Sequence, residues 1–259
     1  MMNKTVFLFA THKLTDFVLE QYYRLKLATK NIGVLYLLIE DGELQQIPVD
    51  VKYYSFSVDT LNELNYEPIE ESIIPGSNHF PVLQFYKEHP EFLYYWNIEY
   101  DVYFNGKWES FFDPFEMIIS DFISSHIEWY TQRPKWDWWK SVQFETLSIP
   151  QNRYLKSFNP IYRISNRALK ALDDVLSLRN SGHHEVVIPT VLDYLGYTIN
   201  DFGGNSEFTL CELNIPCYLY NSELNNWYTE STMRYRPVFN KEAITRKGID
   251  NMLYHPIKF

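Results

Sequence analysis

The stretch Thr5–Ile39, TVFLFATHKLTDFVLEQYYRLKLATKNIGVLYLLI, decides the fold. It begins with a short apolar run, Thr5–Ala10, and ends with a second one, Ile32–Ile39, each suited to a buried strand. Apolar residues recur at helical spacing between these runs, at Leu14, Phe17, Val18, Leu25 and Ala28. Strand, helix and strand in this order predict a right-handed βαβ unit. We therefore expect an α/β sandwich with a mostly parallel central sheet flanked by helices.

Later segments continue this pattern. We expect further strands at Val51–Val58, Phe92–Tyr103 and Met117–Phe122 and near Ile161–Ile164, and helices at Pro81–His89, Asn166–Leu178 and Glu185–Leu195. Pro68, Pro75 and Gly76 mark a long loop that is a candidate lid. No repeat or Gly/Ser linker divides the chain, which predicts a single domain over residues 1–259.

Composition excludes several classes of function. The net charge of −10, without a basic run, argues against nucleic acid and anionic membranes as partners. The amino-terminal apolar run is too short for a signal peptide or a membrane span, which predicts a cytoplasmic protein. Cys211 and Cys217 lack the spacing of a zinc site and do not indicate a disulfide framework.

The segment Trp96–Tyr103, WNIEYDVY, carries the chemistry. If it is a strand, Asn97, Glu99, Asp101 and Tyr103 share one face, because side chains alternate. Two neighbouring carboxylates on a covered face cannot both stay charged without a cation, and hard oxygen ligands favour Mn²⁺ or Mg²⁺. The competing interpretation is an edge strand whose polar face meets water. We favour the metal site, because ligands of α/β sheets lie at the carboxyl ends of the strands.

This segment, within YYWNIEYDVYFNGKW, resembles the core of a family of glycosyltransferases of the GT-A type, with a W-x-I/L-E-x-D-V motif. NHFPVLQFYKEHPEF resembles the preceding helix of that family, and GHHEVVIPT resembles its acidic helix start. The resemblance places Glu99-x-Asp101 where these enzymes carry DxD, with Asp101 as the favoured metal ligand. It implies a nucleotide-binding half, residues 1–105, followed by an acceptor-binding half and carboxyl-terminal extension, residues 106–259.

Glu185 is the candidate catalytic base. It opens an expected helix, where the helix dipole favours an ionised carboxylate. In inverting GT-A enzymes, an acidic residue at a similar helix start removes the proton of the acceptor hydroxyl. A dipole-favoured surface glutamate is the alternative.

The remaining candidates surround these carboxylates. The resemblance implies a late histidine at the metal, here His255, and a basic residue near the diphosphate, here Lys258; a frayed terminus is the alternative. Thr11, His12, Glu40 and Asp41 follow the first two strands, where a nucleotide would lie. For the acceptor, Trp136 and Trp138 are candidate stacking residues and His184 a candidate lining residue, although core packing explains a tryptophan cluster equally well.

Together these residues predict a metal-assisted, inverting glycosyltransferase that moves a sugar from a nucleotide-sugar donor, expected to be UDP-linked, to a carbohydrate or glycan acceptor. Two alternatives stay open. A glycoside hydrolase would use Glu99 or Asp101 with Glu185 as paired carboxylates. A non-catalytic carbohydrate-binding protein would use the tryptophans alone.

Overall fold

The computed structural model describes residues 5–204, 206–210, 216–220 and 230–258. The helices and strands, with η marking 3₁₀ helices, are β1 Thr5–Thr11, α1 Asp16–Thr29, β2 Val34–Glu40, η1 Asp41–Gln46, β3 Tyr53–Phe56, α2 Thr60–Glu63, α3 Phe80–Glu88, β4 Tyr94–Glu99, β5 Tyr103–Phe104, α4 Trp108–Phe112, η2 Asp113–Met117, β6 Phe122–Trp129, η3 Tyr130–Gln132, η4 Asp137–Ser141, η5 Gln151–Arg153, β7 Leu155–Ser165, α5 Asn166–Leu176, α6 His184–Tyr194, β8 Ile199–Asp201, β9 Phe239–Asn240, α7 Lys241–Lys247, β10 Leu253–Tyr254 and β11 Ile257–Lys258.

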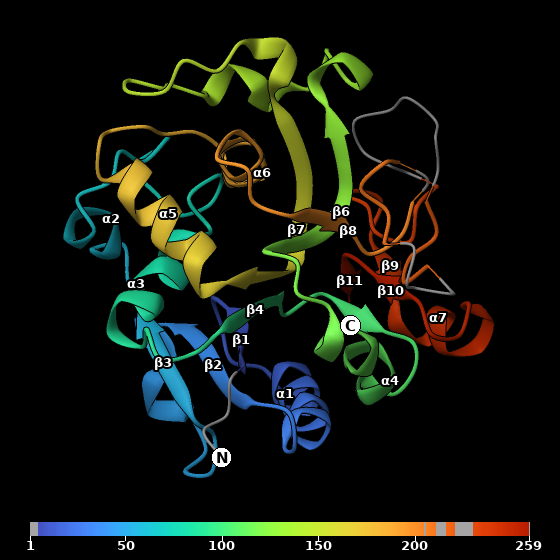
Figure 1. Cartoon of the computed structure of the whole chain (residues 1–259). Coiled ribbons are helices and arrows are strands. Elements are labelled where there is room, and N and C mark those ends of the chain that lie inside the picture. The colour runs from blue at the N-terminus through green and yellow to red at the C-terminus, as the bar shows by residue number, and fades with distance from the viewer. Residues whose placement is uncertain (1–4, 205, 211–215, 221–229, 259) are drawn as a thin grey trace.

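A seven-stranded sheet in the order β3-β2-β1-β4-β7-β6-β8 runs through the molecule (Figure 1). The pairs β3–β2, β2–β1, β1–β4 and β6–β8 are parallel, whereas β7 runs antiparallel to both of its neighbours. The strand–helix–strand unit predicted from Thr5–Ile39 is present as β1, α1 and β2. The prediction of an α/β fold with a mostly parallel central sheet is therefore confirmed.

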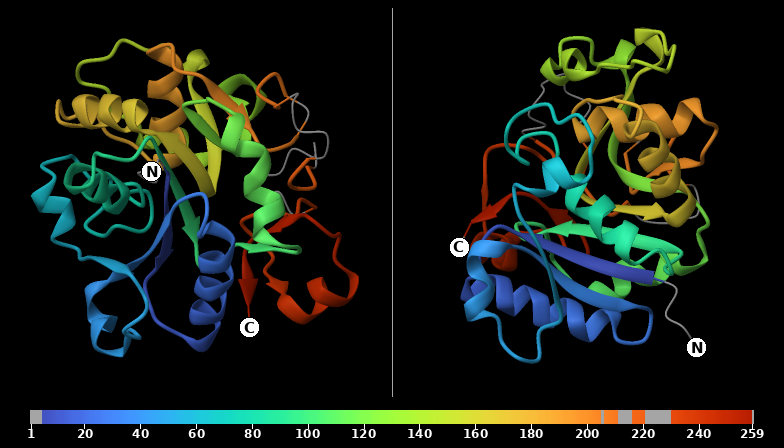
Figure 2. Two further views of the ribbon diagram at one scale, coloured as in Figure 1. Left: turned by 60° about the horizontal axis from the view of Figure 1, so that its bottom comes forward. Right: turned by 90° about the vertical axis from the view of Figure 1, so that its left-hand side faces the viewer.

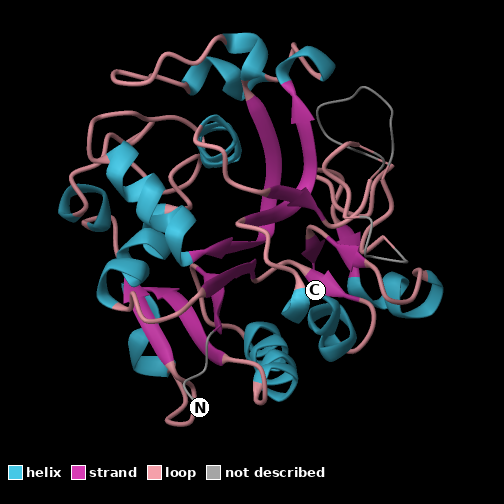
Figure 3. Ribbon diagram, viewed as in Figure 1, coloured by secondary structure: helices cyan, strands magenta, loops and turns pink. Residues whose placement is uncertain are grey.

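Helices cover both faces of this sheet (Figures 1 and 2). One apolar core joins the sheet to α3, α5 and α6, and includes Val6, Leu8 and Tyr95. The other joins it to α1, α4 and η2, and includes Phe7 and Trp96. Consecutive strand residues enter opposite cores because side chains alternate along a strand. Figure 3 shows the strands through the middle of the molecule with helices on either side.

Local capping fixes where two of these helices begin. Thr15 precedes α1 and accepts a hydrogen bond from the amide of Val18. Ser165, the last residue of β7, accepts one from the amide of Ala168 in α5. Each hydroxyl satisfies an amide that lacks a partner in the first helical turn.

Three strand predictions need correction. The strand predicted over Phe92–Tyr103 ends at Glu99, and a turn separates it from β5. The strand predicted over Met117–Phe122 is wrong, because Met117 ends η2 and β6 begins only at Phe122. The strand expected near Ile161–Ile164 is β7, which is longer because its polar side chains are also buried. Apolar periodicity misses a strand of this kind.

The described part of the carboxyl-terminal region is folded onto the sheet domain. Leu253 and Tyr254 of β10 pair with β5, and the amide of Ile257 donates to the carbonyl of Asp101 over 3.0 Å. The alternative of a frayed terminus is therefore wrong up to Lys258. These contacts carry residues from the end of the chain back to the end of β4.

Two expectations from composition concern membranes and thiols. Among the described helices, no helix has both the length and the apolar character required to cross a bilayer. Cys217 is a free, half-buried thiol. Cys211 lies outside the described residues.

Candidate active site at the carboxyl edge of the sheet

The carboxyl ends of β1, β2 and β4 meet at one edge of the sheet. The three strands run parallel, with Ala10 opposite Glu99 and Thr11 opposite Ile39. β4 lies between β1 and β7, in the middle of the sheet order. The alternative of a peripheral strand with a solvated polar face is therefore wrong, and Glu99 lies at the position that ligands use in such sheets.

Glu99, Asp101 and His255 converge at this edge. His255 Nε2 lies 3.4 Å from Asp101 Oδ1 and 4.0 Å from Glu99 Oε2. One ligand atom from each of the three residues falls within 4.8 Å of the others. Asp101 comes from the turn after β4 and not from the strand itself. The three residues predicted as metal ligands are therefore neighbours in space, although two of them are separated from the third by more than 150 residues.

The electrostatics of the cluster reflect a shortage of positive charge. Burial and the neighbouring Asp101 raise the pKa of Glu99 to about 7. Burial lowers the pKa of His255, but Asp101 and Glu99 outweigh this effect, so that the net pKa is raised. In the absence of another cation, a proton on His255 or on Glu99 balances the two carboxylates.

These residues fit a divalent cation. The Asp101 Oδ1 atom is buried without a hydrogen-bond partner among the described residues. The opposite ring nitrogen of His255, Nδ1, lies 2.8 Å from the carbonyl oxygen of Arg234 and donates to it, so Nε2 faces the carboxylates and is the nitrogen that could exchange its proton for a metal. Two carboxylates with one imidazole suit Mn²⁺, and three protein ligands leave positions for substrate oxygens.

Asn78, which the sequence patterns do not single out, also belongs to the cluster. It precedes α3, and its Nδ2 atom donates to Glu99 Oε1 over 3.3 Å. The Asn78 Oδ1 atom is buried and has no hydrogen-bond partner in the described structure. Its position inside the NHFP segment of the resemblance is the one signal in the sequence that could have pointed to it.

Glu185 lies at the start of α6, as predicted, but in a different environment from the one expected there. Its Oε1 atom accepts a hydrogen bond from the amide of Asn159 over 3.2 Å, and its Oε2 atom is 3.8 Å from His183 Nδ1. Burial raises the pKa of Glu185 to about 7. The prediction of a carboxylate kept ionised by the helix dipole is therefore wrong, because the effect of burial on the pKa of Glu185 is larger than the effect of the helix terminus. The alternative of a surface glutamate is also wrong.

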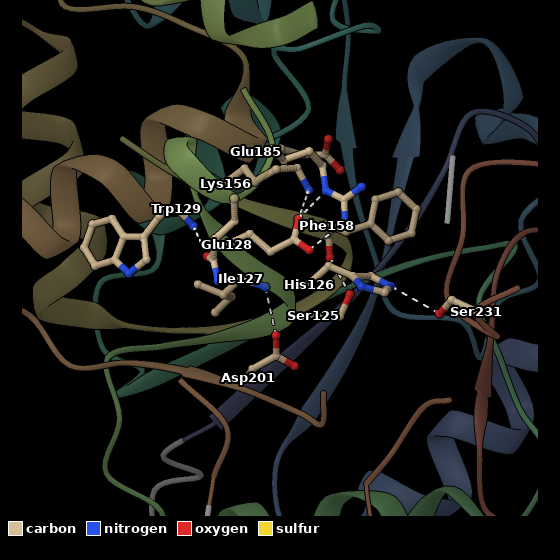
Figure 4. Close-up of polar contacts among 12 residues, drawn as sticks. Ser125, His126, Ile127, Glu128, Trp129, Lys156, Phe158, Glu185, Asp201 and Ser231 are labelled. Carbon is tan, nitrogen blue, oxygen red and sulfur yellow. Dashed lines mark hydrogen bonds and ion pairs between the residues drawn. The ribbon is translucent and has the colours of Figure 1, made fainter. Parts of the chain in front are cut away.

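A buried charge network lies behind Glu185 (Figure 4). Arg133 makes two hydrogen bonds to the carboxylate of Glu128, of 2.6 and 2.8 Å, and Lys156 Nζ lies 3.8 Å from the same carboxylate. The charge of Lys156 lowers the pKa of Glu185 against the effect of burial. Lys156 was missed by the sequence patterns, because β7, Leu155–Ser165, carries several polar residues and nothing in its sequence singles out this lysine.

The tryptophans predicted to bind an acceptor are largely used in packing. Trp136 and Trp139 are buried in a small core with Val186 of α6, and Lys156 Nζ lies 4.7 Å from the centre of the Trp136 ring. Trp138 stacks on His183 with 4.4 Å between ring centres. Trp138 also lines a cavity of about 180 Å³, together with Glu67, Pro68, Ile69, Glu70, Ser141, Gln143 and Ser181. The candidate lid loop thus forms one wall of a cavity beside Trp138.

His184 is buried beside two other histidines. Its ring lies 4.8 Å from that of His183 and 6.3 Å from that of His79, between ring centres. Burial lowers the pKa of His184 to about 3, so the ring is neutral. Both ring nitrogens of His79 and the Nδ1 atom of His184 are buried without a hydrogen-bond partner among the described residues.

The residues predicted to bind a nucleotide lie at the same edge but differ in exposure. Thr11 is buried and its hydroxyl donates to the carbonyl of Lys13, whereas His12 is exposed and packs edge-on against Tyr100. Glu40 ends β2, and Asp41 begins η1 in an exposed position. Lys258 lies in β11, next to Ile257, whose amide donates to the carbonyl of Asp101.

No protein-family model and no curated protein matches the sequence. A structure from Bacillus anthracis assigned as a glucose-1-phosphate thymidylyltransferase is similar over 78% of this chain and 87% of its own, with 10% identity and a TM-score of 0.45. A glycosyltransferase involved in glycosylation of the major capsid of PBCV-1 is similar over 78% and 84%, with 13% identity and a TM-score of 0.38.

A third similar structure is the inositol-1-phosphate CTP transferase from T. maritima, over 82% of this chain and 92% of its own, with 12% identity and a TM-score of 0.41. Two of the three proteins are nucleotidyltransferases by description and one is a glycosyltransferase. Likeness at this level carries no argument about activity. The geometry and charges of the site are therefore the basis for a function.

Proposed function

We propose that this protein is a glycosyltransferase that takes a sugar from a nucleotide-sugar donor and transfers it, with Mn²⁺ or Mg²⁺, to a hydroxyl group of a carbohydrate acceptor. The observation that carries the proposal is the convergence of Glu99, Asp101 and His255 at the carboxyl edge of the sheet. A cation held there would neutralise the diphosphate that leaves the sugar. UDP is the nucleotide we expect.

The chain supplies three groups to the cation and a set of residues around it. Asp101 and Glu99 would provide oxygen ligands, and His255 would provide Nε2 in place of its proton, because Nδ1 donates to the Arg234 carbonyl. Thr11, His12, Glu40 and Asp41 lie where the nucleoside would bind, at the ends of β1 and β2. Lys258 would place its charge near the diphosphate.

Glu185 is the proposed base. Its pKa of about 7 is well suited to a group that must accept a proton near neutral pH. In a single displacement, the acceptor oxygen would attack the anomeric carbon from the side opposite the nucleoside diphosphate, whose bond to the sugar breaks, and Glu185 would take the proton of the acceptor hydroxyl. Such a displacement inverts the anomeric centre. Trp138, with Trp136 and His184 behind it, would line the acceptor side, where the cavity beside the 67–70 loop lies.

Product analysis tests this proposal. The purified chain is incubated with Mn²⁺ and UDP-, GDP- and dTDP-linked sugars, with and without a mixture of simple glycosides as acceptors, and the released nucleotide is identified. We expect a nucleoside diphosphate to be released. In a parallel incubation with a sugar phosphate and a nucleoside triphosphate, release of pyrophosphate would instead identify a nucleotidyltransferase.

The two other interpretations predict different results for the same purified chain, in a glycoside-cleavage assay and in a thermal-stability measurement. A glycoside hydrolase would cleave a simple glycoside without nucleotide or metal. A non-catalytic carbohydrate-binding protein would be stabilised by sugars and not by nucleoside diphosphates with Mn²⁺. Either result would overturn the proposed function.

A further inference from the structure

Strand β6 contains a residue in an unusual backbone conformation. His126 has a φ of +51°, and the pairing of β6 with β7 shifts register on both sides of it, between Ile123 and Ser125 and between Ser125 and Glu128. A histidine in the left-handed region is uncommon and costs free energy, and bulges of this kind are enriched next to functional sites. The bulge therefore calls for a physical reason.

The surrounding residues hold this bulge in place. The amide of Ile127 donates to Asp201 Oδ2 over 2.8 Å, and the amide of His126 donates to the hydroxyl of Tyr218 over 3.0 Å. That hydroxyl in turn donates to Asp201 Oδ1 over 2.9 Å, so β8 and Tyr218 together fix two consecutive amides. Asp201, Tyr218 and His126 are all buried.

The ring of His126 contacts a segment near the end of the chain. Its Nε2 atom lies 2.7 Å from the carbonyl oxygen of Met233. The same atom lies 3.2 Å from the hydroxyl of Ser231 (Figure 4). Burial lowers the pKa of His126 to about 3, so the ring is neutral and Nε2 carries the hydrogen that Met233 accepts. Ser231 also accepts a hydrogen bond from the amide of Met233 over 3.1 Å.

The same segment holds His255 at three points. The amide of His255 donates to the carbonyl of Thr232 over 2.9 Å, and the carbonyl of His255 accepts from the amide of Arg234 over 3.2 Å. The ring contact from His255 Nδ1 to the Arg234 carbonyl, 2.8 Å, sets which nitrogen faces Asp101. Position and tautomer of His255 therefore both depend on where residues 231–234 lie.

We propose that His126 is a positioning residue for the cation site. It anchors Ser231–Arg234 to the central sheet, and this segment presents His255 Nε2 to the ion held by Asp101 and Glu99. The inference rests on the proposed function, since it needs a cation at that site. If the bulge had a structural role alone, its loss would lower the stability of the fold and leave the affinity for the ion unchanged.

Mn²⁺ affinity of the full chain, measured by electron paramagnetic resonance with the metal alone, tests this inference. H126N keeps a residue that tolerates the left-handed backbone, but its side chain is too short to reach Met233. We expect its Mn²⁺ dissociation constant to rise about 10- to 100-fold, as for loss of a group that orients a metal ligand. H126Q, whose amide reaches further, should recover part of the affinity.

A matched control separates positioning from stability. Asn180 is also a buried polar side chain, after α5, where it donates to the carbonyl of Val175 and to the hydroxyl of Thr146. N180A should lower the melting temperature and leave Mn²⁺ binding as in the wild type. If H126N does not fold, S231A removes the second contact of the ring and leaves His126 itself intact.

The outcomes are distinguishable. If H255A weakens Mn²⁺ binding but folded H126N and S231A bind as tightly as the wild type, the inference is overturned and the proposed function stands. If the wild-type chain binds no Mn²⁺, the proposed function fails and the inference falls with it. Weak binding by H126N and S231A with normal binding by N180A supports the positioning role.

Discussion

Glu99 and Glu185 are two partly buried carboxylates whose pKa values are raised to the same level, about 7, yet their surroundings differ. Glu99 has a second carboxylate, Asp101, and an imidazole beside it, whereas Glu185 has the buried cation Lys156 and an amide donor from Asn159. The first region, around Glu99, lacks a permanent cation among its described residues. The second region, around Glu185, has one in Lys156. Burial is the largest cause of the raised pKa in both regions, and the neighbours decide whether each group is suited to hold an ion or to accept a proton.

The largest effect is expected from removing the charge of Asp101. D101N leaves one carboxylate and one imidazole, too few charged ligands to hold the ion on the leaving diphosphate. We expect sugar transfer to fall by more than about 100-fold, with Mn²⁺ binding lost and the melting temperature unchanged or raised. Activity and Mn²⁺ affinity measured on one preparation check this; retention of both would remove the metal role from this region.

E185Q should affect the other region alone. Loss of a general base typically costs about 10²- to 10⁴-fold in rate, and the neutral amide fits the same buried position. We expect slower transfer with unchanged affinity for Mn²⁺ and nucleoside diphosphate, measured by single-turnover kinetics and by titration. Unchanged transfer would point to another base or to a retaining route.

K156M tests whether the charge of Lys156 acts on Glu185 and not on the cation site. Because the charge of Lys156 lowers the pKa of Glu185, its removal should raise that pKa and move the rise of kcat/KM toward higher pH, by about one pH unit. The pH dependence of Mn²⁺ binding should stay in place. K156R, which keeps the charge, is the control. If the pH profile of K156M matches that of the wild type, the charge of Lys156 does not set the pKa of the base.

The smallest effect is expected on stability. The pKa of Glu99 is raised to about 7, so the folded state holds a proton that the unfolded state has lost above about pH 4.5. This stabilising contribution is complete below the unfolded pKa and disappears as the pH rises through 7. E99Q should therefore be more stable than the wild type at pH 8, in metal-free buffer, by about 1 to 3 kcal/mol, and equally stable at pH 4. Urea unfolding at the two pH values measures this, and an effect of equal size at both would contradict it.

The sequence predicts the first region better than the second. Apolar runs at Thr5–Ala10 and Ile32–Ile39 fix parallel strands, and the order of these strands places Glu99 at their carboxyl edge. That His255 would reach this edge followed from resemblance and could not be read from spacing, since it depends on pairing between β10 and β5. Long-range contacts of this kind leave no periodic signal.

The sequence patterns did not predict the residues around Glu185, because these residues are polar and yet buried. Lys156 and Asn159 interrupt the apolar pattern of β7, and their burial depends on partners in other elements. The bulge at His126 is equally hidden, because Asp201 and Tyr218 stabilise it across the sheet. The conformation and burial of these residues are set by tertiary hydrogen bonds, which outweigh the local preferences of the sequence.

Titration of the wild-type chain with Mn²⁺, with and without UDP, shows whether the cluster of Glu99, Asp101 and His255 binds a cation. We expect saturable binding of one ion per chain that tightens when UDP is present and weakens as the pH falls below 7, because Glu99 and His255 then hold protons in place of the metal. Absence of saturable binding, or binding that D101N leaves unchanged, would contradict it.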